Sequence, residues 1–266
     1  DPALARVLAG YADLYVDDAF GSAHRAHAST DGVARLLPNA AGALMTAELD
    51  ALGALVDAPA RPFVVVLGGA KVSDKLAVIE SLLTKADTIV VGGAMAYTFI
   101  KARGGDVGDS LVEDDMLDTA VDVMRRAGAS GVALLLPRDS VCAERLEPGV
   151  TTSLRPSDAI PDGLKGLDIG PTAVSDFSAA LADARTVFWN GPVGVFEIAE
   201  FSAGTLAIAK VIAGLSAFTV VGGGDSLAAV NSAGVGDRID HLSTGGGASL
   251  EFLEGRELPG VAVLRS

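Results

Sequence analysis

Short apolar runs alternate along the chain with stretches that have a helical spacing of apolar and polar residues. The runs are continuous, as expected for strands buried on both faces of a sheet. They predict strands at Leu14–Val16, Phe63–Leu67, Thr88–Val91, Val132–Leu136, Thr186–Trp189 and Phe218–Val221. The stretches between them predict helices at Lys75–Leu83, Glu113–Arg126, Ser175–Ala182, Ala203–Ala213 and Ser226–Ser232. This alternation predicts an α/β fold with a doubly wound parallel sheet, in a Rossmann-like three-layer arrangement.

Two segments fall outside this alternation. Ala40–Val56 predicts a separate, mostly apolar helix that Pro59 ends, because proline cannot continue a helix. We expect this helix, within residues 39–60, to connect a fragment at 1–38 to a domain at 61–250, with a tail at 251–266. Cys142–Leu164 is polar and contains prolines, which indicates a surface excursion.

Composition narrows the possible functions. The formal net charge is −14 and no basic run occurs, which argues against nucleic-acid binding because such proteins neutralise phosphates with a basic surface. No apolar stretch reaches the ~18 residues of a membrane helix, and no signal peptide is evident. With one cysteine, Cys142, no disulfide can form within the chain. We therefore expect a cytoplasmic protein without membrane association.

Glycine-rich loops follow predicted strands or precede predicted helices. They are Gly68-Gly-Ala-Lys71, Gly92-Gly-Ala-Met95, Asp168-Ile-Gly-Pro171, Asn190-Gly-Pro-Val-Gly194, Gly222-Gly-Gly-Asp225 and Thr244-Gly-Gly-Gly247. In an open parallel sheet ligands bind beyond the carboxyl ends of the strands, where glycine permits close approach and helix N-termini attract anions. A single loop fits an ordinary strand-to-helix turn equally well, but the whole set favours phosphate binding. Neither the P-loop pattern nor a dinucleotide fingerprint is present.

A few charged residues beside these loops could take part in phosphate chemistry. Lys71 and Lys75 are four residues apart at a predicted helix start, which places both ammonium groups on one face for a polyphosphate or, alternatively, for solvent. Asp225 could hold Mg²⁺ or cap a helix. Glu197 could accept hydrogen bonds from ribose hydroxyls or remain a surface carboxylate. No general-base motif is evident, which suits a carboxylate acceptor because a carboxylate is already ionised at pH 7.

The run from Asp18 to Thr30 holds two of the three histidines around an arginine. Arg25 could form a bidentate pair with a phosphate or carboxylate. No cysteine or carboxylate cluster accompanies His24 and His27, so we expect structural hydrogen bonds there rather than a metal site. Trp189 is expected in the core, and Cys142 is not expected to be a nucleophile because no base neighbours it in sequence.

Long motifs in a fixed order resemble those of phosphoglycerate kinases. They are Asp18-Ala-Phe-Gly-Ser-Ala-His-Arg-Ala-His27, Leu67-Gly-Gly-Ala-Lys-Val-Ser-Asp-Lys75, Gly166-Leu-Asp-Ile-Gly-Pro171, Trp189-Asn-Gly-Pro-Val-Gly-Val-Phe-Glu197, Val221-Gly-Gly-Gly-Asp225 and Ser243-Thr-Gly-Gly-Gly-Ala-Ser-Leu-Glu251. The resemblance implies the glycolytic transfer of a phosphoryl group between 1,3-bisphosphoglycerate and ADP, giving 3-phosphoglycerate and ATP, by a monomer that uses Mg²⁺.

The resemblance also implies roles for individual residues. Lys71, Gly223 and Gly246 would act at the transferring phosphoryl group, Asp225 would bind Mg²⁺, and Arg25 would contact 3-phosphoglycerate. The implied nucleotide-binding residues are Gly69, Ala70, Lys75, Gly93, Gly166, Asn190, Pro192, Glu197, Gly222, Gly223, Gly224, Asp225 and Ser226.

The chain departs from the family pattern in one large respect. Motifs resembling R-x-D-x-N-V-P and H-x-G-R-P, which carry most of the substrate-binding arginines of the family's N-terminal domain, are absent. We therefore interpret 1–38 as the last piece of that domain in an N-terminally truncated chain. We expect this chain to bind MgADP with little or no turnover. A nucleotide-binding module without catalysis is the alternative, and the two hypotheses differ in whether an acid substrate can be held, for which Arg25 is the remaining arginine.

Overall fold

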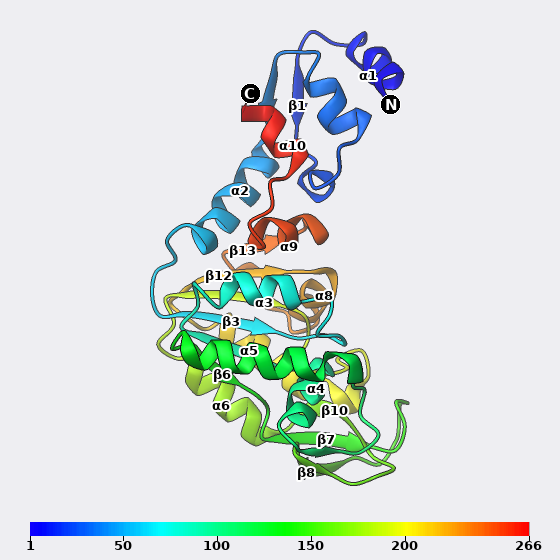
Figure 1. The fold of residues 1–266 in the computed structure, drawn as a ribbon, viewed down its shortest axis with the longest axis vertical. Coiled ribbons are helices and arrows are strands. Elements are labelled where there is room, and N and C mark those ends of the chain that lie inside the picture. Colours follow the sequence, from blue (N-terminus) through cyan, green and yellow to red (C-terminus); the bar gives the residue numbers. More distant parts are fainter. Residues whose placement is uncertain (266) are drawn as a thin grey trace. The chain divides into compact units, whose positions relative to one another are not determined.

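The computed structural model describes residues 1–265, which form two compact units. One unit combines Asp1–Ala58 with the chain from Ser243 onward, and the other is Pro59–Leu242. The sequence instead suggests boundaries after residues 38, 60 and 250. Figure 1 labels the elements of both units, and each unit is described by itself.

A six-stranded sheet, in the order β13-β12-β11-β3-β4-β6, organises the unit Pro59–Leu242. The neighbouring strands from β12 to β6 pair in parallel. Numbered along the chain, this is the 3-2-1-4-5-6 order of doubly wound folds, in which the order reverses between β3 and β11. The strands are β3 Phe63–Leu67, β4 Thr88–Val91, β6 Ala133–Leu135, β11 Thr186–Asn190, β12 Phe218–Gly222 and β13 His241–Ser243.

Helices cover both faces of this sheet, as the burial of alternate strand residues shows. Val64, Val66 and Trp189 pack with buried residues of α6, α7 and α8 in one hydrophobic cluster. Because side chains alternate along a strand, the equally buried Phe63 and Val65 face the opposite layer. Figure 1 shows α3 and α5 in front of the sheet. The helices are α3 Leu76–Leu82, α4 Met95–Ala102, α5 Leu117–Ala129, α6 Pro171–Leu181, α7 Ala203–Ile212 and α8 Gly224–Ser232.

The predicted doubly wound α/β fold is confirmed, but the strand predicted at Leu14–Val16 lies outside its sheet. The structure has β1 at Tyr15–Asp17, paired in parallel with β2 at Asn39–Ala41 in the other unit. The helix predicted from Ala40 consequently begins later, as α2 at Ala43–Val56. The side chain of Asp18 caps this helix, because its Oδ1 accepts a hydrogen bond from Met45 N in the first turn at 2.8 Å.

The segment Cys142–Leu164, expected as a surface excursion, contains strands that were not predicted from the sequence. An antiparallel sheet of order β10-β7-β8 runs through it, and a short parallel pair joins β5 to β9. More buried and less buried residues alternate along β7, β8 and most of β10 instead of forming continuous apolar runs, and a small hydrophobic cluster around Tyr97 and Cys142 lies among these strands. Their bounds are β5 Asp106–Val107, β7 Asp139–Ala143, β8 Ser153–Pro156, β9 Ala159–Ile160 and β10 Lys165–Ile169.

The other unit contains α1 Pro2–Ala9, α2, α9 Gly247–Leu253 and α10 Pro259–Ala262. Its two chain segments pack together: Gly260 N donates a hydrogen bond to Ala23 O at 2.9 Å. In addition, the buried carboxylate of Glu48 accepts one from Thr244 N at 2.9 Å. Short helical turns occur in the two units at Phe20–Ser22, Ala28–Gly32, Asp114–Met116, Ala199–Phe201, Gly236–Arg238 and Val263–Arg265. Among residues 1–265 there is no helix whose length and apolar character would let it cross a membrane.

Candidate functional site

A cavity of about 500 Å³ opens in the unit Pro59–Leu242, beside the carboxyl ends of β3, β4 and β11. This is the edge of the sheet where doubly wound folds bind ligands, at the point where the strand order reverses. The cavity is mostly apolar, with carboxylates at a few places. Its lining comprises Gly69, Ala70, Gly93, Ala94, Tyr97, Asp109, Leu111, Pro137, Leu146, Lys165–Ile169, Pro192–Val195, Glu197 and Asp225.

Two glycine loops meet where β3 and β11 end. Gly68 N donates a hydrogen bond to Asn190 O and Gly69 N donates one to Pro192 O, each at 3.0 Å. A Cβ at Gly68 would lie 2.1 Å from Pro192 O, and one at Gly191 would lie 2.1 Å from Gly68 O. Only glycine permits this approach of two backbones, which explains why both loops are glycine-rich.

A polar group of side chains links these loops to the start of α8. Lys75 Nζ donates to Oδ1 of the buried Asn190, whose Nδ2 donates to Gly222 O at 2.7 Å. The buried hydroxyl of Ser226 accepts a hydrogen bond from Gly191 N at 2.6 Å. Burial lowers the pKa of Lys75, while Asp74 and Asp225 raise it and offset part of that effect. The result is a half-buried ammonium group held at the strand ends, where an anion would stabilise it.

The N-terminus of α8 follows directly from β12. Gly223, the N-cap, has a φ of 93°, which places it in the left-handed region that favours glycine. Asp225 lies in the first turn of α8 and also lines the cavity. The first amides of a helix have no partners within the helix and carry partial positive charge, so this end is suited to bind phosphate oxygens.

The loop that carries Lys71 is held by a residue that sequence reasoning did not single out. The carboxylate of Glu113 accepts hydrogen bonds from Val72 N at 2.5 Å, Ser73 N at 3.2 Å and Ser73 Oγ at 2.6 Å. Burial alone would raise the pKa of Glu113, but these hydrogen bonds, with the charge of Lys71, lower it overall. Lys71 itself is exposed and does not line the cavity.

Two further cavity residues, Asp168 and Tyr97, were also not predicted. Asp168 is 2% exposed, and its carboxylate accepts hydrogen bonds from Gly204 N at 2.7 Å and Ile169 N at 2.9 Å. Burial raises its pKa to about 7 in spite of these two bonds. Tyr97 donates a hydrogen bond to Ser140 Oγ at 2.8 Å, and its ring lies against Gly166. Asp168 does fall within the Gly166–Pro171 motif, which was the available signal; no sequence pattern marks Tyr97.

The structure divides the predicted site residues into three groups. Seven line the cavity: Gly69, Ala70, Gly93, Gly166, Pro192, Glu197 and Asp225. Lys75, Asn190, Gly222, Gly223, Gly224 and Ser226 lie outside this lining but at the ends of the same strands or at the start of α3 or α8. Lys71 lies on the loop between β3 and α3, while Arg25 and Gly246 belong to the other compact unit.

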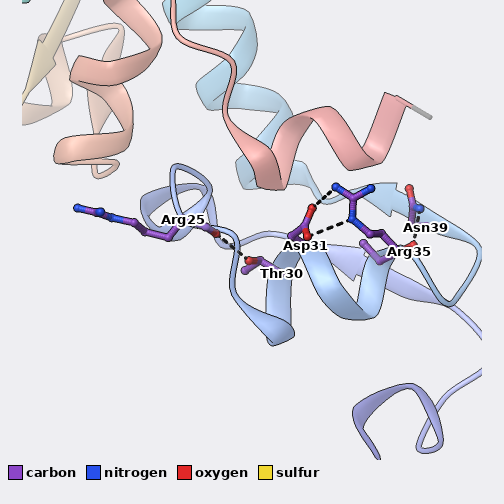
Figure 2. Close-up of polar contacts among 6 residues, drawn as sticks. Arg25, Thr30, Asp31, Arg35 and Asn39 are labelled. Carbon is purple, nitrogen blue, oxygen red and sulfur yellow. Dashed lines mark hydrogen bonds and ion pairs between the residues drawn. The ribbon is translucent and has the colours of Figure 1, made fainter. Parts of the chain in front are cut away.

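Arg25 is exposed, and within residues 1–265 its guanidinium forms no ion pair. Its carbonyl oxygen accepts a hydrogen bond from Thr30 Oγ1 at 3.3 Å, as Figure 2 shows. In the same view the side chain of Arg25 points away from Thr30, whereas Arg35 forms a bidentate ion pair with Asp31. Arg25 therefore offers a free cation for an anionic ligand.

Three expectations about other residues can be compared with the structure. We expected His24 to form a structural hydrogen bond. Its Nδ1 does not form one, because this atom is buried without a hydrogen-bond partner among the described residues. Trp189 is fully buried as predicted, and its Nε1 donates to Gly191 O at 2.8 Å. Cys142 is also buried, and burial raises the pKa of its thiol to about 11, which is consistent with an inert cysteine.

The fold and the site together define a class. A doubly wound sheet with an apolar cavity at its topological switch point, bordered by a half-buried lysine and a helix N-terminus, is typical of α/β proteins that bind phosphorylated nucleotides.

Comparison with known proteins gives the family. The family model of phosphoglycerate kinase matches residues 1–256. A phosphoglycerate kinase from Thermus thermophilus is 60% identical over 265 residues, covering 99% of this chain and 68% of that protein. The enzyme from Rubrobacter xylanophilus is 60% identical over 264 residues, covering 99% of this chain and 67% of that protein.

Solved structures agree with this match. The structure of phosphoglycerate kinase from Coxiella burnetii has a TM-score of 0.95 and 42% identity, covering 100% of this chain and 68% of that one. That from Pyrococcus horikoshii OT3 has a TM-score of 0.85 and 33% identity, covering 98% of this chain and 65% of that one. The chain belongs to the phosphoglycerate kinase family of glycolytic phosphotransferases and spans about two thirds of the length of these relatives.

Proposed function

We propose that this chain binds ADP and ATP in the cavity at the carboxyl ends of β3, β4 and β11. The single observation that carries the proposal is the position of Lys75. Its ammonium group is half-buried and donates to Asn190, the last residue of β11, and the carboxyl end of this strand borders the apolar cavity lined by Gly69, Gly93 and Gly166. The apolar walls suit a purine ring, and the lysine suits the phosphates that extend from it.

The remaining nucleotide contacts follow from the arrangement of the loops. Ala70 and Pro192 would pack against the base and sugar, and Glu197 would accept hydrogen bonds from the ribose hydroxyls. Ser226 would hold the loop that begins at Gly191, because its hydroxyl accepts a hydrogen bond from Gly191 N, and Asn190 would approach the nucleotide while its Nδ2 stays bonded to Gly222 O. The amides of Gly222, Gly223 and Gly224, near the start of α8, would lie along the phosphates.

Asp225 is the residue that would hold Mg²⁺. The described residues contain no group of three or more His, Cys, Asp or Glu side chains placed to bind a metal. A single carboxylate still fits Mg²⁺, because this ion is usually bound by one or two carboxylates with phosphate oxygens and water. Asp225 lines the cavity in the first turn of α8, beside the proposed phosphate position. When bound, Mg²⁺ would neutralise phosphate charge and orient the nucleotide.

For phosphoryl transfer, we propose that Arg25 holds 3-phosphoglycerate or 1,3-bisphosphoglycerate. Lys71, Gly223 and Gly246 would stabilise the charge that develops on the transferring phosphoryl group. The acceptor carboxylate is ionised at neutral pH, so no general base is needed. Because Arg25 is the sole arginine assigned to the acid substrate, we propose that the chain by itself turns over poorly. We also propose that it acts in the cytoplasm as a monomer, without nucleic-acid or membrane partners.

The testing experiment is a calorimetric titration of ADP into the purified chain with Mg²⁺ present, repeated with the Lys75→Ala and Asp225→Asn variants. We expect binding of wild type, weaker binding of Lys75→Ala, and loss of the Mg²⁺ dependence in Asp225→Asn. Lys210→Ala is the matched control, because Lys210 is exposed on α7 outside the cavity lining. A folded chain that fails to bind ADP would disprove the proposal. A coupled assay of turnover then separates an impaired kinase from a nucleotide-binding module without catalysis.

A further inference from the structure

A second cavity, of about 730 Å³, lies in the same unit and has no part in the proposed nucleotide site. The end of α4, the segment after β6, strand β8 and the start of α6 form its walls. It shares one lining residue, Pro137, with the first cavity. Its lining comprises Ile100, Arg103–Gly105, Leu136–Asp139, Leu154–Pro156, Asp158 and Thr172.

Three guanidinium groups line this cavity in a chain whose formal net charge is −14. Arg138 forms a bidentate ion pair with Asp176, with nitrogen–oxygen distances of 2.5 and 2.7 Å. Arg103 and Arg155 have no carboxylate partner among the residues that the structure describes. Arg155 Nη1 donates only to the adjacent carbonyl of Leu154, at 2.8 Å.

The two aspartates in the lining do not neutralise the positive charges of both Arg103 and Arg155. Asp139 is already used as the cap of α6, because its carboxylate accepts hydrogen bonds from Thr172 N at 3.0 Å and Ala173 N at 2.7 Å. Asp158 is the remaining carboxylate of the lining, and it is exposed. Two guanidinium groups without a carboxylate partner therefore share the lining with one exposed carboxylate, so hydrogen-bond donors in the cavity remain available for an anion.

Apolar side chains also line this cavity. Ile100 and Pro137 are buried at the cavity, whereas Leu154 is 53% exposed beside Arg155. Apolar residues and guanidinium groups in one lining favour a ligand that has both an apolar body and an anionic group. Inorganic anions alone would leave this apolar surface uncovered.

We propose that this cavity binds a small organic dianion, with carboxylate or phosphate groups on an apolar body. Arg103 and Arg155 donate the charge-assisted hydrogen bonds, since a guanidinium presents paired N–H groups that match the oxygens of either group. Leu136 and Leu154 cover the apolar body. This binding is separate from the nucleotide site and does not depend on it.

The test uses benzene-1,2-dicarboxylate as the probe, titrated calorimetrically into the full chain at constant ionic strength. The neutral diamide of the same ring is the ligand control. We expect the dicarboxylate to bind at millimolar concentration and the diamide not to bind. Arg103→Gln and Arg155→Gln should each weaken binding about tenfold, the effect of losing one charge-assisted hydrogen bond. Arg185→Gln should bind like wild type, because Arg185 is an exposed arginine outside the cavity lining.

Weaker binding in either cavity variant, with Arg185→Gln unchanged, supports the proposal. Absence of dicarboxylate binding, equal binding of the diamide, or unchanged affinity in both cavity variants overturns it. A thermal melt shows whether each variant is folded. If Arg155→Gln disturbs the folding of β8, the affinity of Arg103→Gln for the dicarboxylate is the deciding measurement, since Arg103 is exposed just beyond α4.

Discussion

Lys75 and Asn190 are 115 residues apart in the chain, yet the lysine Nζ donates a hydrogen bond to the asparagine Oδ1. The pair joins the start of α3 to the end of β11, on either side of the point where the strand order reverses. Asn190 is fixed in turn by Gly222 O at the end of β12. The ammonium group is therefore positioned before any ligand arrives, and a phosphate need not order a mobile side chain.

This arrangement predicts that ADP affinity depends on the protonation of Lys75. Burial lowers the pKa of Lys75, so its charge is lost at a lower pH than that of an ordinary lysine. Bound phosphate would favour the charged form, and ADP affinity should fall as the pH rises toward the usual lysine value of about 10.4. Calorimetric titrations of ADP from neutral to alkaline pH would measure this.

The Lys75→Ala variant should bind ADP about tenfold more weakly at neutral pH and should show almost no further loss as the pH rises. Lys210→Ala should keep both the affinity and the pH dependence of wild type, since Lys210 is exposed on α7. An alkaline loss of affinity that persists undiminished in Lys75→Ala would assign the titration to another group.

A second prediction concerns stability and Asp168. Because burial raises its pKa to about 7, the folded chain binds a proton at Asp168 that the unfolded chain has released between pH ~4 and ~7. The free energy of unfolding contributed by this residue therefore falls as the pH rises through that window. The slope for one group cannot exceed about 1.4 kcal/mol per pH unit.

Urea unfolding of wild type and Asp168→Asn across pH 4 to 8 tests this expectation. The wild type should lose stability relative to Asp168→Asn as the pH rises to about 7, and the difference should level off above it. Asp183→Asn, at an exposed position, is the matched control and should run parallel to wild type between pH 5 and 8. Parallel curves for wild type and Asp168→Asn would show that Asp168 titrates normally.

The parts of the fold that depend on the local pattern of apolar and polar residues could be predicted from the sequence. The run Phe63–Leu67 is apolar throughout and is a strand over that same range, because a strand buried on both faces needs no polar position. Strand β7 could not be recognised in this way. It combines buried Ser140 and Cys142 with a capping aspartate, and its partners β8 and β10 follow only later in the chain.

Local sequence patterns likewise reveal some residues of the candidate site and not others. Its glycines could be found because they adjoin predicted strands, and Lys75 because it begins a predicted helix. Tyr97 and Glu113 could not, and the motif that contains Asp168 does not indicate its role, because each of the three acquires that role from a partner far along the chain. The separations are 43 residues from Tyr97 to Ser140, 40 from Ser73 to Glu113, and 36 from Asp168 to Gly204. Such pairings depend on tertiary structure, which a local pattern does not contain.

A third prediction concerns the loop between β3 and α3. Glu113→Gln replaces a carboxylate that accepts three hydrogen bonds from Val72 and Ser73 with an amide that has only one acceptor oxygen. The amides of Val72 and Ser73 should exchange with solvent about tenfold faster, as expected for about 1.4 kcal/mol of lost local stability. Hydrogen exchange followed by NMR measures this residue by residue.

The stabilisation that Glu113 gives to this loop should depend on pH in a known direction. The pKa of Glu113 is lowered in the folded chain, so its contribution is complete above the unfolded value of about 4.3 and is lost as the pH falls through the folded one. Asp115→Asn is a suitable control, because Asp115 is an exposed acid on the following turn. Equal protection of Val72 and Ser73 in wild type and Glu113→Gln would exclude a positioning role for Glu113.

A matched pair of glycine substitutions tests how tightly the cavity wall is packed. A Cβ at Gly166 would lie 1.9 Å from Tyr97 Oη, and the tyrosine cannot move freely because it is buried and bonded to Ser140. Gly166→Ala should therefore lower the free energy of unfolding by about 1–3 kcal/mol and weaken ADP binding. Gly128→Ala makes the same chemical change within α5, where a Cβ would meet no atom within 4 Å. It should raise stability by up to about 1 kcal/mol, since alanine is the better helix former, and leave ADP affinity unchanged. If chemical denaturation gave both variants the same sign, the ring of Tyr97 would not be confined against Gly166 as described.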